Sequence, residues 1–210
     1  MTSRMMKAVA ALAVALSVVL AFPAGTVMAA APTPQARANH LLAQLAKAPS
    51  LDAAIGALSP ADRTLVIEAL TPVTEKVTVA TGPTGNTKSL GLVSPAVVGS
   101  GCWTFGWINH VGYNMWGSAV VTYSNKFFWC SNGSVLTNQP TRWETGSVQG
   151  LCWVYNGVYY DPTYGGQGST WYESYSQGYF SCTSLWITIQ TWYPAIDVTI
   201  YAYGNPTYHW

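Results

Sequence analysis

The sequence contains few charged side chains. Its 210 residues include nine Lys or Arg, eight Asp or Glu and three His, for a net charge of +1. Nucleic-acid binding requires a concentrated basic surface, and attachment to an anionic membrane surface requires a basic cluster. The composition provides neither, so we expect no nucleic-acid partner and no polybasic mode of membrane attachment.

Metal and cofactor motifs are also missing. No Cys-x-x-Cys pair or Asp-x-Asp cluster occurs, and the three histidines are far apart in sequence, at His40, His110 and His209. These patterns disfavour zinc and calcium sites. The Gly-rich segment Tyr164–Ser169 lacks the Lys of a phosphate-binding loop and is typical of a hairpin tip. We expect no metal and no cofactor.

Catalytic candidates are equally few. No Gly-x-Ser-x-Gly motif marks a serine nucleophile. A glycosidase needs two carboxylates across one cleft, and after Gly101 the acidic residues are Glu144, Asp161, Glu173 and Asp197. Glu144 with Glu173 is the pair to consider, but their spacing gives no support. His110 is a candidate base, although a lone His is more often a structural hydrogen-bonding group. Catalysis is therefore the less favoured alternative.

The N-terminal residues form a typical secretion signal. Arg4 and Lys7 precede an uncharged apolar run at 8–22. Small residues around Ala29 match the pattern that signal peptidase recognises, so we place cleavage after Ala29 and assign residues 1–29 to a signal peptide. The run is shorter than the roughly 20 residues of a membrane span, which disfavours a membrane anchor. We expect a secreted, extracellular protein with no transmembrane segment in its mature chain.

Three regions of different composition follow the signal peptide. Residues 30–71 are rich in Ala and Leu, and Ser59 followed by Pro60 is a helix start signal, so we expect a short helical arm. We interpret this arm as a spacer, with a docking arm or a pro-segment as the alternatives. Residues 72–100 contain several Gly and Pro and are interpreted as a linker with one strand at 73–79. Residues 101–210 form the β domain.

Turn and alternation signals predict antiparallel strands in the β domain. Asn132-Gly133 and Asn156-Gly157 each separate two β-prone segments, and Asn-Gly favours the positive φ angles of a type I′ hairpin turn. Apolar residues alternate at Ile196, Val198 and Ile200, as in a half-buried strand. We expect an all-β fold, a disulfide-bonded antiparallel β-sandwich preceded by the helical arm.

Two similar segments indicate an internal duplication. YSNKFFWC ends at Cys130 and YSQGYFSC ends at Cys182, while the Cys-Trp pair at Cys102 recurs at Cys152. We interpret residues 101–150 and 151–210 as the halves of a twofold repeat, with chance similarity between strands as the alternative.

The four cysteines predict two disulfides, because an exported chain folds in an oxidising compartment. Equivalent halves favour Cys102–Cys130 with Cys152–Cys182, or else a symmetric exchange between the halves. We prefer the local pairs, each of which closes a loop of about 30 residues and contributes about 3–4 kcal/mol in the chain-entropy model.

Short motifs in the β domain resemble those of secreted Cys/Trp-rich β proteins of actinobacteria. They are the two Cys-Trp pairs, the element Trp129–Gly133 and the Gly-Tyr-Asn at 112–114. The resemblance covers residues 101–210. It implies an extracellular disulfide-bonded β domain and carries no activity with it.

Aromatic residues are abundant where charges are scarce. Residues 101–210 contain all ten Trp and all thirteen Tyr, so we expect part of this ring area at the surface. In the strand predicted at 185–192, Trp186, Gln190 and Trp192 share one face, and Tyr201 and Tyr203 alternate in the same way. Flat rings with a neighbouring amide suit the apolar faces and hydroxyls of a sugar. We assign these five residues to a glycan-binding platform.

These observations favour a non-catalytic binding module whose partner is an extracellular polysaccharide or cell-wall glycan. One alternative is a secreted effector, similar to a toxin or bacteriocin, that targets a membrane or a protein, because aromatic residues also favour membrane interfaces. A second alternative is a structural envelope protein that self-associates. The sequence specifies no oligomeric state.

Overall fold

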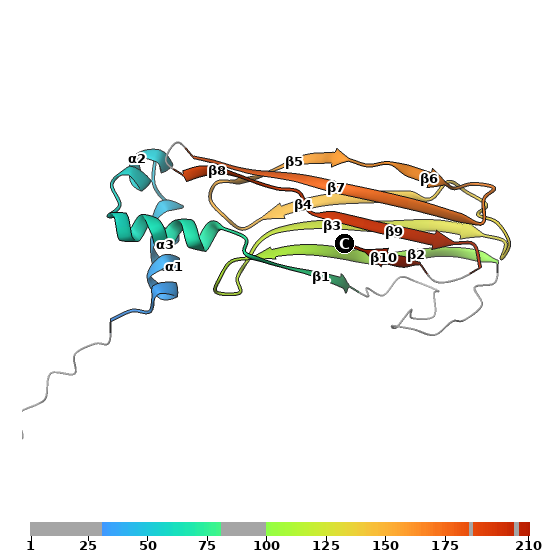
Figure 1. Cartoon of the computed structure of the whole chain (residues 1–210), viewed down its shortest axis with the longest axis horizontal. Helices are drawn as coiled ribbons and strands as arrows, with labels where there is room; N and C mark the ends of the chain where they lie inside the picture. The colour runs from blue at the N-terminus through green and yellow to red at the C-terminus, as the bar shows by residue number, and fades with distance from the viewer. Residues whose placement is uncertain (1–30, 81–99, 185–186, 204–205) are drawn as a thin grey trace, which may run out of the picture. The chain divides into compact units, whose positions relative to one another are not determined.

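The computed structural model describes residues 31–80, 100–184, 187–203 and 206–210. The predicted signal peptide, most of the predicted linker and Trp186 lie outside these ranges. Within them the fold is mostly β, and three short helices precede the strands (Figure 1). The helices are α1 (Pro34–Leu45), α2 (Leu51–Gly56) and α3 (Pro60–Leu70). The strands are β1 (Thr74–Ala80), β2 (Gly101–Tyr113), β3 (Ala119–Ser131), β4 (Thr141–Val148), β5 (Trp153–Tyr160), β6 (Thr163–Gly165), β7 (Trp171–Ser184), β8 (Ile187–Trp192), β9 (Ala195–Tyr201) and β10 (Thr207–His209).

Each helix begins at a polar capping residue. Ser59 Oγ accepts a hydrogen bond from the Asp62 amide at 3.1 Å, and Pro60 occupies the first helical position, as the sequence predicts. Thr33 and Ser50 cap α1 and α2 in the same way. The arm also has an internal ion pair, since Arg37 Nε on α1 lies 2.5 Å from Asp62 Oδ1 on α3. The predicted helical arm is therefore confirmed.

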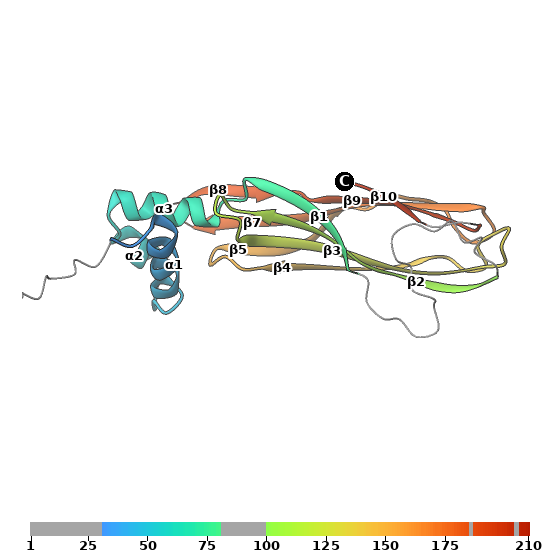
Figure 2. The same ribbon diagram turned by 90° about the horizontal axis from the view of Figure 1, so that it is seen from below.

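The strands form two antiparallel sheets, and most strands run roughly horizontally in Figures 1 and 2. The first sheet has the order β1-β2-β3-β4. The second has the order β10-β9-β7-β5, and β6 and β8 also pair with β7. β1 confirms the strand predicted at 73–79, and it pairs with β2 along its whole length. The first sheet therefore begins before Gly101, inside the segment interpreted as a linker.

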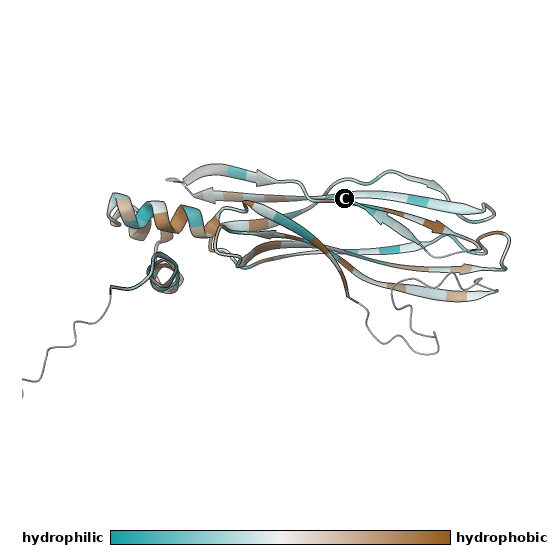
Figure 3. Ribbon diagram, turned by 60° about the horizontal axis from the view of Figure 1, so that its bottom comes forward, coloured by the Kyte–Doolittle hydropathy of each residue, from teal (hydrophilic) through white to brown (hydrophobic). Residues whose placement is uncertain are grey.

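The hydrophobic core lies between the two sheets. Large buried side chains on β3, including Phe127 and Trp129, meet Phe180 of β7 and the alternating residues of β9. The predicted alternation is confirmed, because Ile196, Val198 and Ile200 are all fully buried. Figure 3 shows that most strand residues take pale colours of intermediate hydropathy, as expected for strands rich in Tyr, Trp, Ser and Thr and poor in charge.

Two disulfides join neighbouring strands. Cys102 of β2 is bonded to Cys130 of β3, and Cys152 is bonded to Cys182 of β7. These are the local pairs expected from the sequence. Cys102 and Cys130 are also register partners across β2 and β3, so this bond lies within a single sheet.

The two Asn-Gly signals have different outcomes. At Asn132-Gly133 the chain turns after β3, as predicted, but the isolated bridge between Ser131 and Leu136 encloses four residues and no strand follows before β4, so the two-residue hairpin is not formed. The hairpin predicted at Asn156-Gly157 is wrong, because β5 continues through both residues. Gly157 has a φ of +99° and lies at a register shift between β5 and β7. Its positive φ therefore serves a β-bulge rather than a turn.

The helical arm contacts the β structure through the end of α3. Trp153 donates its indole N–H to the Leu70 carbonyl at 2.7 Å, and Asn114 Nδ2 donates to the Ala69 carbonyl at 2.9 Å. These bonds satisfy carbonyls that the end of a helix leaves without an intrahelical partner. Leu70 itself is buried. The arm thus packs on the strands through the end of α3.

Candidate ligand-binding face

The central strand of the second sheet has one buried and one open face. Along β7 the even-numbered residues Tyr172, Ser174 and Ser176 are buried toward the first sheet. The odd-numbered residues point the other way, because successive side chains of a strand alternate. They are Trp171, Glu173, Tyr175, Gln177 and Tyr179. The outer face of the second sheet is therefore rich in aromatic rings.

Three tyrosines gather at one end of this face, and we call Tyr159, Tyr179 and Tyr193 the tyrosine cluster. The rings of Tyr179 and Tyr193 stack with centroids 5.1 Å apart and an interplanar angle of 7°. Tyr159 meets Tyr193 edge-on at 5.0 Å and Tyr179 at 6.4 Å. The Tyr159 side chain is 66% exposed and that of Tyr193 is 41% exposed. The cluster thus presents pre-arranged rings to solvent.

Neighbouring residues extend and orient the cluster. Tyr160 of β5 meets Tyr175 of β7 edge-on at 5.8 Å. Gln177 lies between these two groups on β7, and its Nε2 donates to the Tyr193 carbonyl at 3.3 Å. Two register shifts between β5 and β7, one at Gly157 and one at Tyr159, set the directions in which Tyr159 and Tyr160 point. Backbone geometry, rather than loop flexibility, therefore positions these rings.

A second aromatic group lies at the other end of β7. Tyr201 is the register partner of Trp171, and its ring lies 5.8 Å from that of Tyr203. Tyr203 is exposed. Eight residues of β7 separate Trp171 from Tyr179, which corresponds to about 27 Å along an extended strand. The structure thus brings together the two predicted platform residues Tyr201 and Tyr203, at a distance from the tyrosine cluster.

The other predicted platform residues turn inward. Trp192 is the register partner of the buried Phe180, and its ring meets that of His110 edge-on at 5.3 Å. Its indole N–H donates to Glu75 Oε1 at 2.5 Å. Gln190 donates to Thr71 Oγ1 at 3.0 Å. Both side chains are half-buried with polar atoms engaged, and Trp186 lies outside the described residues.

His110 has the structural environment that a lone histidine usually has. It is 4% exposed, with Nδ1 lying 2.9 Å from the Ala195 carbonyl oxygen and Nε2 lying 2.7 Å from Glu75 Oε2. Both ring nitrogens thus have oxygen partners, one on β9 and one on β1. This arrangement joins the two sheets and leaves neither nitrogen open to a substrate.

A buried polar network crosses the space between the sheets. Arg142 on β4 bonds Glu144, and its Nη1 donates to Ser174 Oγ at 2.6 Å. Tyr123 donates to Glu144 Oε2 at 3.3 Å and makes a second, short bond with Ser176. Because Tyr123 has one hydroxyl hydrogen, Ser176 is the donor in that bond. Ser176 thus donates to Tyr123, and Tyr123 donates to the Glu144 carboxylate, which is the final acceptor.

The network has electrostatic consequences but no catalytic geometry. Burial raises the pKa of the Tyr123 hydroxyl above its ordinary value, and burial followed by the nearby Glu144 raises the pKa of Tyr155. Glu144 points into the core while Glu173 lies on the outer face of the second sheet. These two carboxylates therefore do not face one cleft, which a glycosidase requires.

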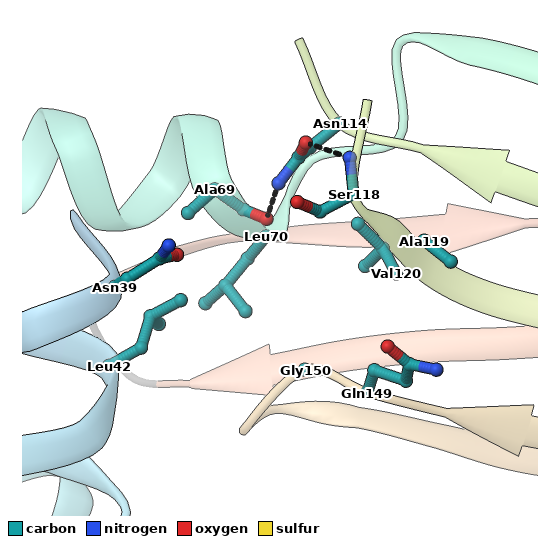
Figure 4. A pocket seen from close by; sticks show the side chains of 10 residues that line it. All are labelled: Asn39, Leu42, Ala69, Leu70, Asn114, Ser118, Ala119, Val120, Gln149 and Gly150. Carbon is teal, nitrogen blue, oxygen red and sulfur yellow. Dashed lines mark hydrogen bonds between the residues drawn. The ribbon is translucent and has the colours of Figure 1, made fainter. Parts of the chain in front are cut away.

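A small crevice lies where the helical arm meets the strands (Figure 4). Its volume is about 150 Å³, below the roughly 300 Å³ at which small-molecule sites begin. The Asn114 side chain at its wall is fully used, since Nδ2 donates to Ala69 and Oδ1 accepts from the amides of Trp116 and Ser118. The crevice is therefore a small gap in the packing between the arm and the strands, and Asn114 has no free hydrogen-bonding atom for a ligand there.

The described residues contain neither a metal site nor a membrane-spanning helix. No group of three or more His, Cys, Asp or Glu side chains is placed to hold an ion in this part of the chain. No helix found there is long and apolar enough to cross a membrane. The open aromatic face of the second sheet is thus the strongest candidate site so far.

Comparison with protein-family models, with curated proteins and with solved structures gave no match. The chemistry of the exposed faces is therefore the basis on which a function can be assigned. The sequence did contain one signal for the tyrosine cluster, the alternation of Tyr175, Gln177 and Tyr179. Its other members come from separate strands.

Proposed function

We propose that this protein is a secreted, non-catalytic module that binds polysaccharide or cell-wall glycan. The observation that supports this most directly is the tyrosine cluster, with its stacked and exposed rings on the outer face of the second sheet. Flat aromatic rings match the apolar C–H faces of pyranose sugars and bury much area at little entropic cost. The Gln177 amide oxygen, whose neighbouring Nε2 donates to the Tyr193 carbonyl, and the tyrosine hydroxyls suit contacts with sugar hydroxyls.

Secretion is part of this proposal. Two disulfides in a small β-rich chain agree with folding in an oxidising compartment. The charged and apolar segments at the N-terminus of the sequence agree with export.

A duplicated β unit is the architecture that we propose for the module. The strands β2, β3 and β4 are adjacent in that order in the first sheet, as β5, β7 and β9 are in the second. In each sheet, a disulfide ties the segment that contains the first strand to the second strand. This correspondence supports related halves at 101–150 and 151–210.

Binding measurements on matched variants test the proposed function. Wild-type protein is titrated calorimetrically with neutral soluble glycans and sedimented with insoluble cellulose, chitin and peptidoglycan. Replacing Tyr159 or Tyr193 by Ala is expected to weaken binding about tenfold, since an aromatic contact contributes about 0.5–1.5 kcal/mol beyond the area it buries. Tyr164→Ala, an equally exposed tyrosine outside the cluster, is the control and should bind normally.

The same experiment separates the alternatives. Absence of binding to every glycan would overturn the proposal, as would unchanged affinity in both cluster variants. A parallel assay of dye leakage from liposomes, with full-length mature protein, tests the membrane-effector alternative. Leakage without glycan binding would favour that alternative.

A further inference from the structure

The outer face of the first sheet differs chemically from that of the second. Lys126 of β3 points outward because it alternates with the buried Asn125 and Phe127, and its register partner Trp143 on β4 points the same way. Thr145 of β4, two residues further on, is also exposed. The two acidic residues of the first sheet bond toward the second sheet instead. Glu75 of β1, whose side chain is half-exposed, bonds to His110, and Glu144 of β4 bonds to Arg142. The described outer face of this sheet therefore carries lysine and hydroxyl groups without a carboxylate.

A lysine lies between two tryptophans at the centre of this face. Lys126 Nζ is 5.9 Å from the ring centroid of Trp107 and 5.9 Å from that of Trp143. Trp143 is the register partner of Lys126 on β4, and its side chain is 47% exposed. Among the described residues Lys126 forms no ion pair. Its ammonium group thus lies beside an open ring without an anionic partner.

The second sheet has the opposite charge. Its strands contain no Lys or Arg, because the chain has none after Arg142. Glu173 and Asp197 lie on its outer face with the tyrosines. An anionic ligand is therefore repelled by the outer face of the second sheet and attracted by that of the first.

We propose that the Trp107–Lys126–Trp143 site binds a polysaccharide that carries carboxylate groups, that is, a polymer of uronic acids. A uronate carboxylate accepts a charge-assisted hydrogen bond from Lys126 Nζ, while the pyranose ring of the same or the next sugar packs on the exposed Trp143. The exposed hydroxyl of Thr145 borders the site and suits a sugar hydroxyl, whereas the buried Ser124 hydroxyl donates to Asn109 Oδ1 at 2.7 Å.

A second lysine on the same face favours a polymer over a single sugar. Lys76 of β1 is exposed, and its register partner Val111 is paired with Thr122, four residues before Lys126 on β3. Two strand spacings and four residues of rise place the two lysine Cα atoms roughly 16 Å apart. A chain of uronic acids laid across the sheet reaches both cations. This site is separate from the tyrosine cluster and does not depend on it.

Matched polymers test the chemistry of the site. Affinity electrophoresis and calorimetry are performed with polygalacturonate, with its fully methyl-esterified form, which keeps the sugar ring but has no charge, and with inorganic polyphosphate. Wild-type protein is expected to bind polygalacturonate at least tenfold more tightly than the ester or polyphosphate, with an affinity that falls as salt is added. Equal binding of the ester, no binding of polygalacturonate, or stronger binding of polyphosphate would overturn the proposal.

Matched variants locate the site. Lys126→Gln and Trp143→Ala are each expected to weaken polygalacturonate binding about tenfold, because each removes one principal contact. Lys47→Gln removes the same charge from the exposed helical arm and should leave binding unchanged. Tyr159→Ala should also bind polygalacturonate normally, so failure of the tyrosine cluster is distinguishable from failure of this site. Equal weakening by Lys47→Gln would indicate general charge attraction and would refute a defined site.

Thermal unfolding of each variant checks its fold. The Lys126→Gln change lies on an open face and replaces the ammonium by a neutral polar side chain one atom shorter, so the unfolding temperature should not change. If Trp143→Ala is destabilised, Trp143→Phe replaces it in the binding series and should retain most of the affinity. A Phe variant that is folded and has lost binding as completely as Lys126→Gln would contradict a stacking role for the ring.

Discussion

At the scale of single residues, the Tyr123 hydroxyl couples stability to pH. It is buried between the sheets, bonded to Glu144 and Ser176, and burial raises its pKa above the ordinary value of 10.0. The unfolded chain therefore loses this proton at a lower pH than the folded protein does. The stabilisation is complete below about pH 10 and is lost as the pH rises further, because ionisation then favours the unfolded state.

This loss of stability at high pH gives a measurable prediction for the Tyr123→Phe variant. The free energy of unfolding in urea, measured between pH 8 and pH 11, should fall less steeply with pH in this variant than in the wild type. Tyr164→Phe, which removes the hydroxyl of an exposed tyrosine, should keep the wild-type slope. Identical slopes in all three proteins would contradict the assigned role of the buried hydroxyl.

At the scale of secondary-structure elements, the bulge in β5 connects backbone conformation to the candidate site. Gly157 has a φ of +99°, and a Cβ atom at this position would meet no atom within 4 Å. The Gly157→Ala variant therefore tests backbone strain without steric crowding. We expect a loss of about 1–2 kcal/mol in stability, the cost of placing an L-residue in the left-handed region.

Gly157→Ala should also weaken the binding of neutral glycans. Relief of the backbone strain would remove the bulge and change the direction in which the Tyr159 side chain points. The matched control is Gly168→Ala, where φ is +83° and no atom lies within 4 Å. It should lose comparable stability and keep its affinity. Parallel loss of affinity in both variants would show that strain in general, rather than the bulge, is responsible.

The element scale also shows which structural features the sequence predicts. Local signals were sufficient for the α3 start at Ser59, the turn at Gly133 and the alternation in β9, because each depends on neighbouring residues. The hairpin predicted at Asn156-Gly157 was wrong because a residue with positive φ occurs both in tight turns and in β-bulges. Only the pairing of β5 with β7 distinguishes the two.

The candidate sites depend on contacts that no local pattern contains. Tyr159, Tyr179 and Tyr193 belong to separate strands or their ends, so their stacking requires the register of the whole second sheet. Trp107 and Trp143 likewise flank Lys126 only after β2, β3 and β4 have paired. The aromatic excess correctly indicated rings at the surface. Which rings would be exposed was determined by long-range pairing, as the inward position of Trp192 illustrates.

At the scale of the whole molecule, the two sheets share one core, and each has one disulfide. The bonded cysteines are 28 and 30 residues apart, which gives similar loop entropies. Replacing Cys102 and Cys130 together by Ala should lower the free energy of unfolding by about 3–4 kcal/mol, and so should the Cys152/Cys182 double variant.

Both double variants should unfold in a single transition, because each sheet buries its inner face against the other. Tryptophan fluorescence and far-UV circular dichroism in urea should give coincident curves. Separate transitions, with one sheet lost before the other, would show that the shared core does not couple them.

The absence of Lys and Arg from the second sheet has a further consequence for proteolysis. Trypsin cleaves after these residues, and the last one in this sequence is Arg142. That side chain is also held between the sheets by Glu144 and Ser174. Trypsin-like proteases therefore have no site from Trp143 to Trp210, the segment that forms β5 to β10 and the tyrosine cluster. Peptide mapping of this half therefore needs an enzyme of different specificity, such as one that cuts at its many aromatic residues.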